Sequence, residues 1–218
     1  MLLEGLRTEV LDAAMHCYKT NLIQGTAGNI SARDRKTGYV LITPTGMPYE
    51  TLTPADVVVL DVQGTVVDGG RKSSSETPMH TAVYRACEHV MGIAHTHSIF
   101  ATTFACLGRA IPPVHYLIAV AGGSVPVAEY ATYGTPEMGA NALRAIGNSK
   151  AVLLRNHGVL TIGGSVGEAI NVAATVEYIA QIAYQALLLG TPEPLPEGEI
   201  SRLITKLATH GQPAPSRA

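Results

Sequence analysis

Three short apolar segments between residues 39 and 67 restrict the fold of this chain more than any other feature of the sequence. Residues 39–42, 57–60 and 65–67 have the length and composition of strands, with turn-forming residues between them. Only residues 61–64 separate the last two segments, whereas a parallel pair needs a crossover of about a dozen residues. We therefore predict antiparallel pairing with a hairpin at residues 61–64. No Gly-x-Gly-x-x-Gly follows a strand, which argues against a Rossmann fold.

Helical periodicity accounts for much of the remaining sequence, so the chain has an α/β composition. We predict helices at residues 2–23, 77–88, 99–107, 135–146, 165–189 and 197–210, and further strands at residues 89–94, 125–127, 151–154 and 159–162. Residues 111–116 are predicted to be extended, because they contain two consecutive prolines. A single domain over residues 1–210 and a loose tail over residues 211–218 follow from the absence of an internal repeat or a second core.

Composition excludes several classes of protein. The 218 residues are 46% hydrophobic and only 15% charged, which leaves little polar surface for a monomer and predicts an oligomer. A net charge of −2 without a basic run argues against a nucleic-acid partner. Apolar stretches are interrupted well short of the roughly 20 residues that span a bilayer. The N-terminus carries Glu4 and no compact hydrophobic signal region, so secretion is not expected. The three cysteines share no motif spacing, so we expect reduced thiols in a cytoplasmic protein.

Four residues carry the pattern of a metal site. Glu76 stands just before a predicted helix, whereas His95 and His97 follow an apolar run and point to one face of an extended chain. His157 follows another apolar run, in an Asn-His-Gly turn. Because no cysteine is near, this donor set predicts an open, catalytic site rather than a closed structural one. Zinc is the first choice, and Mn, Co and Fe remain open.

Two segments are candidates for binding an anion. Residues 24–31 contain small residues that let backbone N–H groups approach a ligand, although the same loop is also typical of an ordinary turn. Residues 73–75 are three serines ahead of a helix start. A metal, a carboxylate and a phosphate cradle together suit proton abstraction next to a ketone, with the metal holding the enediolate and the carboxylate moving the proton.

The motifs resemble the class II aldolase and adducin-head family over residues 1–190. The segments that carry the resemblance are 24–29, 42–46, 74–76, 95–97, 111–116, 130–135 and 156–158. This resemblance implies a three-layer α/β/α domain with a mainly antiparallel sheet, and a four-fold symmetric homotetramer whose sites are shared between subunits. It also implies reversible cleavage of a ketose 1-phosphate to dihydroxyacetone phosphate and an aldehyde, with fuculose 1-phosphate and 5-deoxy- or methylthioribulose 1-phosphate as possible substrates.

The same resemblance assigns roles to individual residues. Glu76, His95, His97 and His157 would bind zinc, and Glu76 would also act as acid and base. Tyr116 would protonate the aldehyde oxygen in a neighbouring subunit's site, a role that no pattern in the sequence predicts by itself. The phosphate would be surrounded by seven residues: Thr26, Gly28, Asn29, Thr43, Gly46, Ser74 and Ser75.

Other reactions on the same fold remain open: a sugar-phosphate 4-epimerase, a methylthioribulose-phosphate dehydratase or a decarboxylase. Ser74, Ser75 and Glu76 favour cleavage over epimerisation. A non-catalytic domain like the adducin head is disfavoured, because all the expected metal ligands are present. The aldehyde end departs from the fuculose-phosphate pattern, since Leu207 and His210 occupy a C-terminal segment that is aromatic-rich in those enzymes, and Met47 and Tyr133 lie beside it. His80 is either a partner of the site or a packed helical histidine.

Overall fold

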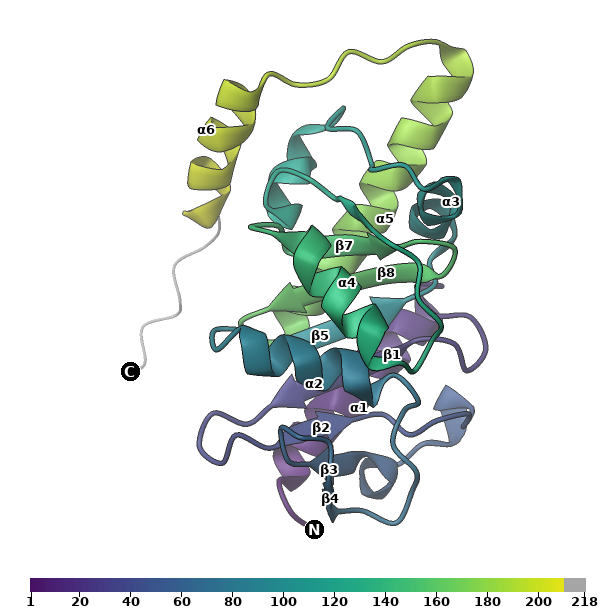
Figure 1. Cartoon of the computed structure of the whole chain (residues 1–218), viewed down its shortest axis with the longest axis vertical. Coiled ribbons are helices and arrows are strands. Elements are labelled where there is room, and N and C mark those ends of the chain that lie inside the picture. Colours follow the sequence, from purple (N-terminus) through teal and green to yellow (C-terminus); the bar gives the residue numbers. More distant parts are fainter. Residues whose placement is uncertain (210–218) are drawn as a thin grey trace.

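The computed structural model describes residues 1–209, and a single eight-stranded sheet forms their centre (Figure 1). The strand order is β4-β3-β2-β1-β5-β8-β7-β6. All pairings are antiparallel except that of β6 with β7. The predicted, mainly antiparallel sheet is thereby confirmed. The strands are β1 (Asn29–Arg33), β2 (Val40–Ile42), β3 (Val58–Leu60), β4 (Val66–Asp68), β5 (Gly92–Thr96), β6 (Val127–Ala128), β7 (Ala151–Leu154) and β8 (Gly158–Gly163).

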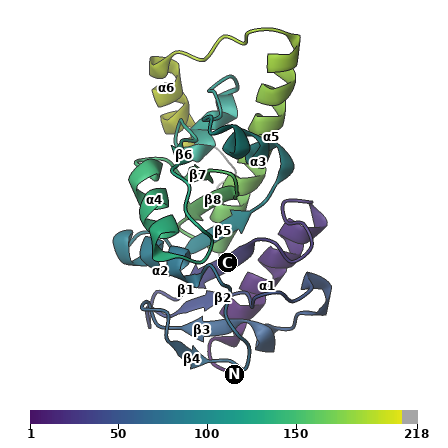
Figure 2. The same ribbon diagram turned by 45° about the vertical axis from the view of Figure 1, so that its right-hand side comes forward.

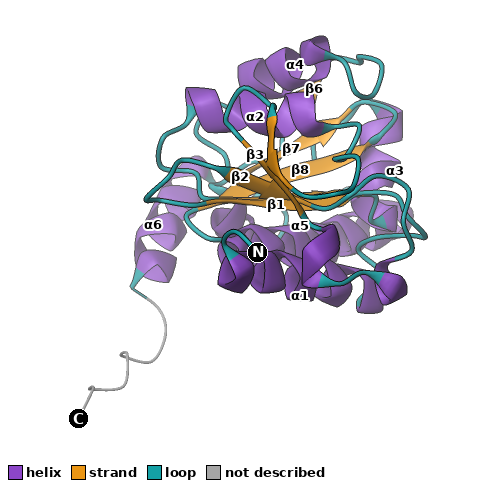
Figure 3. Ribbon diagram, turned by 90° about the horizontal axis from the view of Figure 1, so that it is seen from below, coloured by secondary structure: helices purple, strands orange, loops and turns teal. Residues whose placement is uncertain are grey.

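Helices cover both faces of the sheet and give the three layers expected (Figure 3). One face packs against α1 (Glu4–Lys19) and α5 (Val166–Leu189), and the opposite face packs against α2 (Thr77–Ala86) and α4 (Pro136–Ile146). Helix α3 (Ile99–Leu107) lies against α5. Each layer buries its own apolar cluster, so the central strands β1, β5 and β8 are covered on both sides.

The predicted hairpin forms between β3 and β4, with Leu60 paired to Val66. Its turn is stabilised by Asp61, whose carboxylate accepts hydrogen bonds from the backbone N–H groups of Gln63 and Thr65, each at 2.9 Å. An aspartate that bonds the backbone two residues ahead is a common turn-forming device. Local sequence is therefore sufficient to specify this edge of the sheet.

In the C-terminal half, one 3-10 helix was not predicted, whereas the final helix forms where it was expected. Residues Tyr116–Ala121 form a 3-10 helix, η3, immediately after the extended proline segment. Helix α6 (Glu197–Ala208) packs against η3, at the end of the linker that follows α5 (Figure 2). The predicted tail at residues 211–218 and His210 lie outside the described residues.

Helix α5 has the length and apolar composition that crossing a bilayer requires, and it is the only such helix among residues 1–209. A core helix meets the same criteria. In the fold, α5 contributes buried residues such as Ala169, Val176 and Ala183 to the clusters beneath the sheet. Its apolar character is thus partly explained by packing, whereas Leu188 and Leu189 at its end are exposed.

Candidate active site

The central strands bring the four predicted metal ligands to one point. His95 lies in β5, between β1 and β8, and is paired with Asn29 on one side and Leu160 on the other. His97 follows the end of β5, and His157 lies in the turn between β7 and β8. Glu76 occupies the N-cap position of α2 without a side-chain capping hydrogen bond, and the helix dipole favours a carboxylate there. One candidate ligand atom from each residue lies within 4.8 Å of the others.

The three imidazoles surround a common centre. Their ring centroids are 4.8 to 4.9 Å apart, and each pair of rings is steeply inclined, by 70° to 87°. His95 Nε2 lies 2.9 Å from His97 Nε2 and 3.0 Å from Glu76 Oε2. His157 Nε2 lies 3.4 Å from Glu76 Oε1. Nitrogen and oxygen donors therefore converge from four separate positions in the sequence.

Gly158 makes this approach possible. A Cβ atom at this position would lie 2.5 Å from the carbonyl oxygen of Thr96 and 3.0 Å from the ring of His97. The preceding Asn156 has a φ of 56°, in the left-handed region that asparagine tolerates better than most residues. The Asn-His-Gly sequence thus has a steric purpose, since it lets the turn bearing His157 lie directly against the end of β5.

The donor set fits a divalent cation. The carbonyl oxygen of Val159 can only accept, so His95 Nδ1, 3.0 Å away, donates to it and the neutral ring leaves Nε2 with a lone pair. That lone pair faces another imidazole nitrogen and a carboxylate oxygen. Glu76 Oε1 is buried and has no hydrogen-bond partner among the described residues. A cation at this point would satisfy all these atoms together.

The electrostatics of the site favour the metal-binding forms of Glu76, His97 and His157, and a positive charge beside Glu76. Burial would raise the pKa of Glu76, but the adjacent His95 and His157 outweigh it and hold the pKa well below its ordinary value. Burial lowers the pKa of His97 to about 3 and that of His157 to about 4, and His95 adds to both shifts. Burial acts the same way on His95, but Glu76 overcomes it and raises the pKa. The site therefore stabilises one positive charge beside Glu76.

A cavity of about 220 Å³ opens next to the ligands and contains most of the predicted phosphate residues. Its lining includes no lysine or arginine among residues 1–209: it consists of Thr26, Ala27, Gly28, Asn29, Pro44, Thr45, Gly46, Ser74, Ser75, Glu76, His97, Tyr133 and His157. Gly28 is needed for close packing, because a Cβ atom there would lie 2.7 Å from the carbonyl oxygen of His95. Hydroxyls and backbone N–H groups are thus the available anion ligands.

Several residues that were predicted to belong to the site do not line this cavity. Thr43 is fully buried behind the cavity, where its hydroxyl accepts a hydrogen bond from the N–H of Ile30 at 3.3 Å. Thr45 lines the cavity instead, and the sequence analysis did not single it out. Tyr116 is 50% exposed in η3 and does not line the cavity, and Met47 is absent from its lining as well. Tyr133 does line it.

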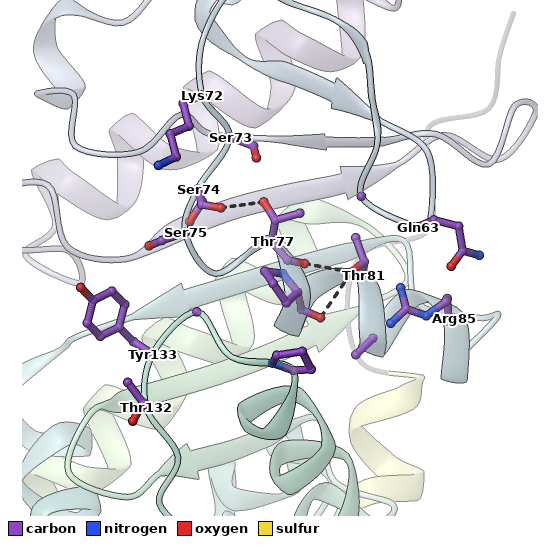
Figure 4. A pocket seen from close by; sticks show the side chains of 15 residues that line it. Gln63, Lys72, Ser73, Ser74, Ser75, Thr77, Thr81, Arg85, Thr132 and Tyr133 are labelled. Carbon is purple, nitrogen blue, oxygen red and sulfur yellow. Dashed lines mark hydrogen bonds between the residues drawn. The ribbon is translucent and has the colours of Figure 1, made fainter.

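A larger groove of about 830 Å³ lies on the other side of the serine segment (Figure 4). It shares Ser74, Ser75 and Tyr133 with the smaller cavity, but it contains none of the four candidate metal ligands. Lys72 and Arg85 are among its lining residues. We place the chemistry in the smaller cavity, because the converging donors and the unpaired carboxylate oxygen lie there.

Comparison with known proteins agrees with this architecture. A family model described as the Class II Aldolase and Adducin N-terminal domain matches residues 8–184. A 5-deoxy-D-ribulose 1-phosphate aldolase from Bacillus thuringiensis is 41% identical, over 97% of this chain and 100% of that protein. The L-fuculose phosphate aldolase of Escherichia coli K12 is 38% identical, over 94% and 95%. A solved L-fuculose 1-phosphate aldolase superposes with a TM-score of 0.93 at 39% identity, over 95% of this chain and 98% of that one.

The chain belongs to the class II aldolase and adducin N-terminal domain family. A second similar protein, from Rhodospirillum rubrum, is a 5-methylthioribulose-1-phosphate/5-deoxyribulose-1-phosphate aldolase that is 40% identical over 96% of this chain and 94% of its own length. These relatives share one fold and one class of reaction but differ in the sugar phosphate that their names specify.

Proposed function

We propose that this protein is a metal-dependent aldolase that cleaves a ketose 1-phosphate to dihydroxyacetone phosphate and an aldehyde. The observation that carries the proposal is the convergence of three imidazole nitrogens on Glu76, whose buried Oε1 has no partner among the described residues. A cavity lined by hydroxyls and backbone N–H groups adjoins them. The similarity to named aldolases over nearly the whole chain supports the same reaction.

Glu76, His95, His97 and His157 would hold the cation, and zinc suits this set of nitrogen and carboxylate donors. A bound divalent cation supplies Lewis-acid stabilisation of the negative charge that develops on substrate oxygens. Glu76 is buried and ionised, and it lies between the histidines and the phosphate-binding loops. It is therefore placed to return a proton to C3 of the substrate after the C3–C4 bond breaks, and to remove that proton in the reverse reaction.

The phosphate group would occupy the cavity formed by Thr26, Gly28, Gly46, Ser74 and Ser75. Its lining residues include the loop ahead of β1 and the turn after β2. Ser74 also stabilises the start of α2, because its hydroxyl accepts from the N–H of Glu76 at 3.2 Å. Binding energy from this end would position the reacting carbons beside Glu76. Thr43 would act indirectly, by holding β2 against β1.

We propose a deoxyketose 1-phosphate as the substrate. The names of the relatives divide between 5-deoxyribulose 1-phosphate, at 41% and 40% identity, and fuculose phosphate, at 38%. These sugars differ only beyond the cleaved bond, at the aldehyde end. Tyr133 lines the cavity, and it is the described residue we expect to contact that end.

The exposed aromatic and aliphatic residues favour a homotetramer with shared sites. Tyr116, Tyr178 and Leu189 are 50%, 50% and 92% exposed in the single chain. Large apolar side chains left in solvent indicate a contact surface. In this arrangement Tyr116 would reach the cavity of a neighbouring subunit, where it would take the proton of the C4 hydroxyl during cleavage and return it to the aldehyde oxygen in the reverse reaction. The free thiols of Cys17, Cys87 and Cys106 are compatible with action in the cytoplasm.

A cleavage screen tests the proposed function. Purified protein is incubated with 5-deoxyribulose, 5-methylthioribulose, fuculose and rhamnulose 1-phosphates, and release of dihydroxyacetone phosphate is measured with and without a chelator. We expect cleavage of at least one of them, lost with the chelator and restored by zinc, manganese or cobalt. Turnover that persists in the chelator, or no dihydroxyacetone phosphate from any substrate, would contradict the proposal.

A further inference from the structure

A chain of four hydrogen bonds runs from Glu76 into the interior through residues that bind neither metal nor substrate in the proposed function, apart from Asn29 at the cavity wall. Asn29 Nδ2 donates to Glu76 Oε2 at 2.8 Å, and Asn29 Oδ1 lies 2.6 Å from His80 Nε2. His80 Nδ1 lies 2.6 Å from Ser31 Oγ, which lies 2.8 Å from the hydroxyl of Tyr84. All five side chains are at most 5% exposed, so water does not substitute for any of these bonds.

The ionised carboxylate of Glu76 determines which group donates in each of these four hydrogen bonds. An ionised carboxylate only accepts, so Asn29 must present its NH₂ group and turn its oxygen toward His80. His80 Nε2 must then carry a proton, and Nδ1 of the neutral ring must accept from Ser31. Ser31 in turn accepts from Tyr84. Burial lowers the pKa of His80 to about 3, which keeps the ring neutral and fixes one donor and one acceptor.

Secondary structure explains how one ring makes both contacts. Asn29 and Ser31 are two residues apart in β1, so their side chains share a face of the sheet. His80 lies one helical turn after Glu76 in α2, and its backbone N–H donates to the carbonyl of Glu76 at 3.3 Å. The imidazole therefore connects strand β1 to helix α2 directly behind the carboxylate.

We propose that His80 is a positioning residue that holds the amide of Asn29 in one orientation, and thereby aims the carboxylate of Glu76 at the metal and the substrate. This inference rests on the proposed aldolase function. Without a donor at His80 Nε2, the amide of Asn29 loses the bond that opposes its rotation. A rotated amide would place its oxygen against Glu76 Oε2, and two acceptors repel.

Two substitutions separate positioning from packing. In His80→Gln the side-chain amide reaches the site of Nε2 and can donate to Asn29, whereas the shorter His80→Asn reaches only the site of Nδ1. We expect His80→Asn to lower kcat about 10- to 100-fold with KM within about twofold, the usual effect of losing a partner of a metal ligand. His80→Gln should recover kcat to within about fivefold of wild type. Both are assayed at saturating zinc, with metal per chain measured by elemental analysis.

The position of the proton on the His80 ring can be measured without an activity assay. In ¹⁵N-histidine-labelled wild-type protein, with His80→Gln used to assign the signal, we expect His80 to be neutral and protonated on Nε2 from pH 5 to 8. Protonation on Nδ1, or a cationic ring, would overturn the proposal whatever the activity of the substituted proteins. Wild-type kcat in metal-loaded His80→Asn would overturn it too. If wild type cleaves no ketose phosphate, the proposed function fails, whereas the nitrogen signal still tests the hydrogen-bond chain.

Discussion

The two ends of the cavity are constructed differently. At the metal end, His95 is fully buried and Glu76 is 5% exposed, and both are held by elements that cross the centre of the fold. At the proposed aldehyde end, Tyr133 lines the cavity and is 66% exposed, and Tyr116, which is proposed to complete the site of a neighbouring subunit, is 50% exposed. The difference indicates that one chain brings the candidate metal ligands together by itself. The preference for an aldehyde would depend on exposed segments and on a neighbouring subunit.

Removal of a histidine ligand should have the largest effect. We expect His95→Ala to lose its bound metal and to lower cleavage by at least about 10,000-fold, because both the Lewis acid and the partner of Glu76 disappear. Metal per chain is measured by elemental analysis, and folding by circular dichroism. His16→Ala, an exposed histidine of α1, is the matched control. A folded His95→Ala protein with full metal content would show that the ligand assignment is wrong.

Loss of the proton carrier should come next. Glu76→Gln keeps the size and the hydrogen bond from Asn29 in altered form, but it cannot carry a proton. We expect kcat to fall about 1,000-fold with metal retained, within the range of general acid–base catalysis. Single-turnover cleavage with zinc-loaded protein measures the effect. Near wild-type cleavage by this variant would remove Glu76 from the proton transfer.

Tyr116→Phe tests whether a neighbouring subunit completes the aldehyde end of the proposed site. We expect kcat to fall about 10- to 100-fold, while KM changes less than twofold, since the phosphate cavity does not include Tyr116. A mixed tetramer of Tyr116→Phe and Glu76→Gln chains sharpens the test: if sites are shared, it should regain part of the lost activity. An unchanged rate in the single variant would leave Tyr116 without a role in the reaction.

Ser75→Ala should have a smaller effect, confined to substrate binding. Ser75 is exposed on the cavity wall, and loss of one hydroxyl from an anion site weakens affinity by about tenfold. KM for the ketose 1-phosphate should therefore rise about tenfold, with kcat nearly constant and metal content unchanged. Ser73→Ala, in the larger groove only, serves as the control. Equal effects of the two substitutions would move the phosphate into that groove.

Acid should lower the free energy of unfolding of the chelator-treated protein. The pKa values of His80, His97 and His157 are lowered to about 3, 3 and 4, so these rings stay neutral when folded but take up protons near pH 6.5 when unfolded. His95, with a raised pKa, is protonated in both states over most of this range and changes the slope little. Unfolding free energy should thus fall from pH 6.5 toward 4, by about 1.4 kcal/mol per pH unit for each net proton. Urea titrations measure the slope, and stability that rises over this range would contradict the assignment.

Local sequence was sufficient to predict most elements of the fold. Asp61–Gly64 encoded the hairpin, and Pro78 and Pro136 marked helix starts that the structure confirms. The 3-10 helix Tyr116–Ala121 was missed, because its stability comes from packing against α5 and α6 rather than from its own residues.

The residue types of the site could be predicted from the sequence, but the hydrogen bonds that connect those residues could not. The Asn-His-Gly turn gave a signal for Gly158, since only glycine permits so close an approach to Thr96 and His97. The series of hydrogen bonds that links Glu76 to Tyr84 depends on the pairing of β1 with β5 and on where α2 crosses β1. Neither contact has a local sequence pattern, so His80 could be noticed only by its spacing from Glu76.

Metal stoichiometry tests the central claim most directly. Chelator-treated wild-type protein is titrated with zinc and followed by calorimetry, beside His95→Ala, His97→Ala and His157→Ala. We expect one tightly bound zinc ion per chain in wild type, and at least a 100-fold weaker affinity in each variant, with proton release that accompanies binding to histidine. A wild-type protein that binds no zinc, or variants that bind it as tightly as wild type, would contradict a metal centre built from these residues.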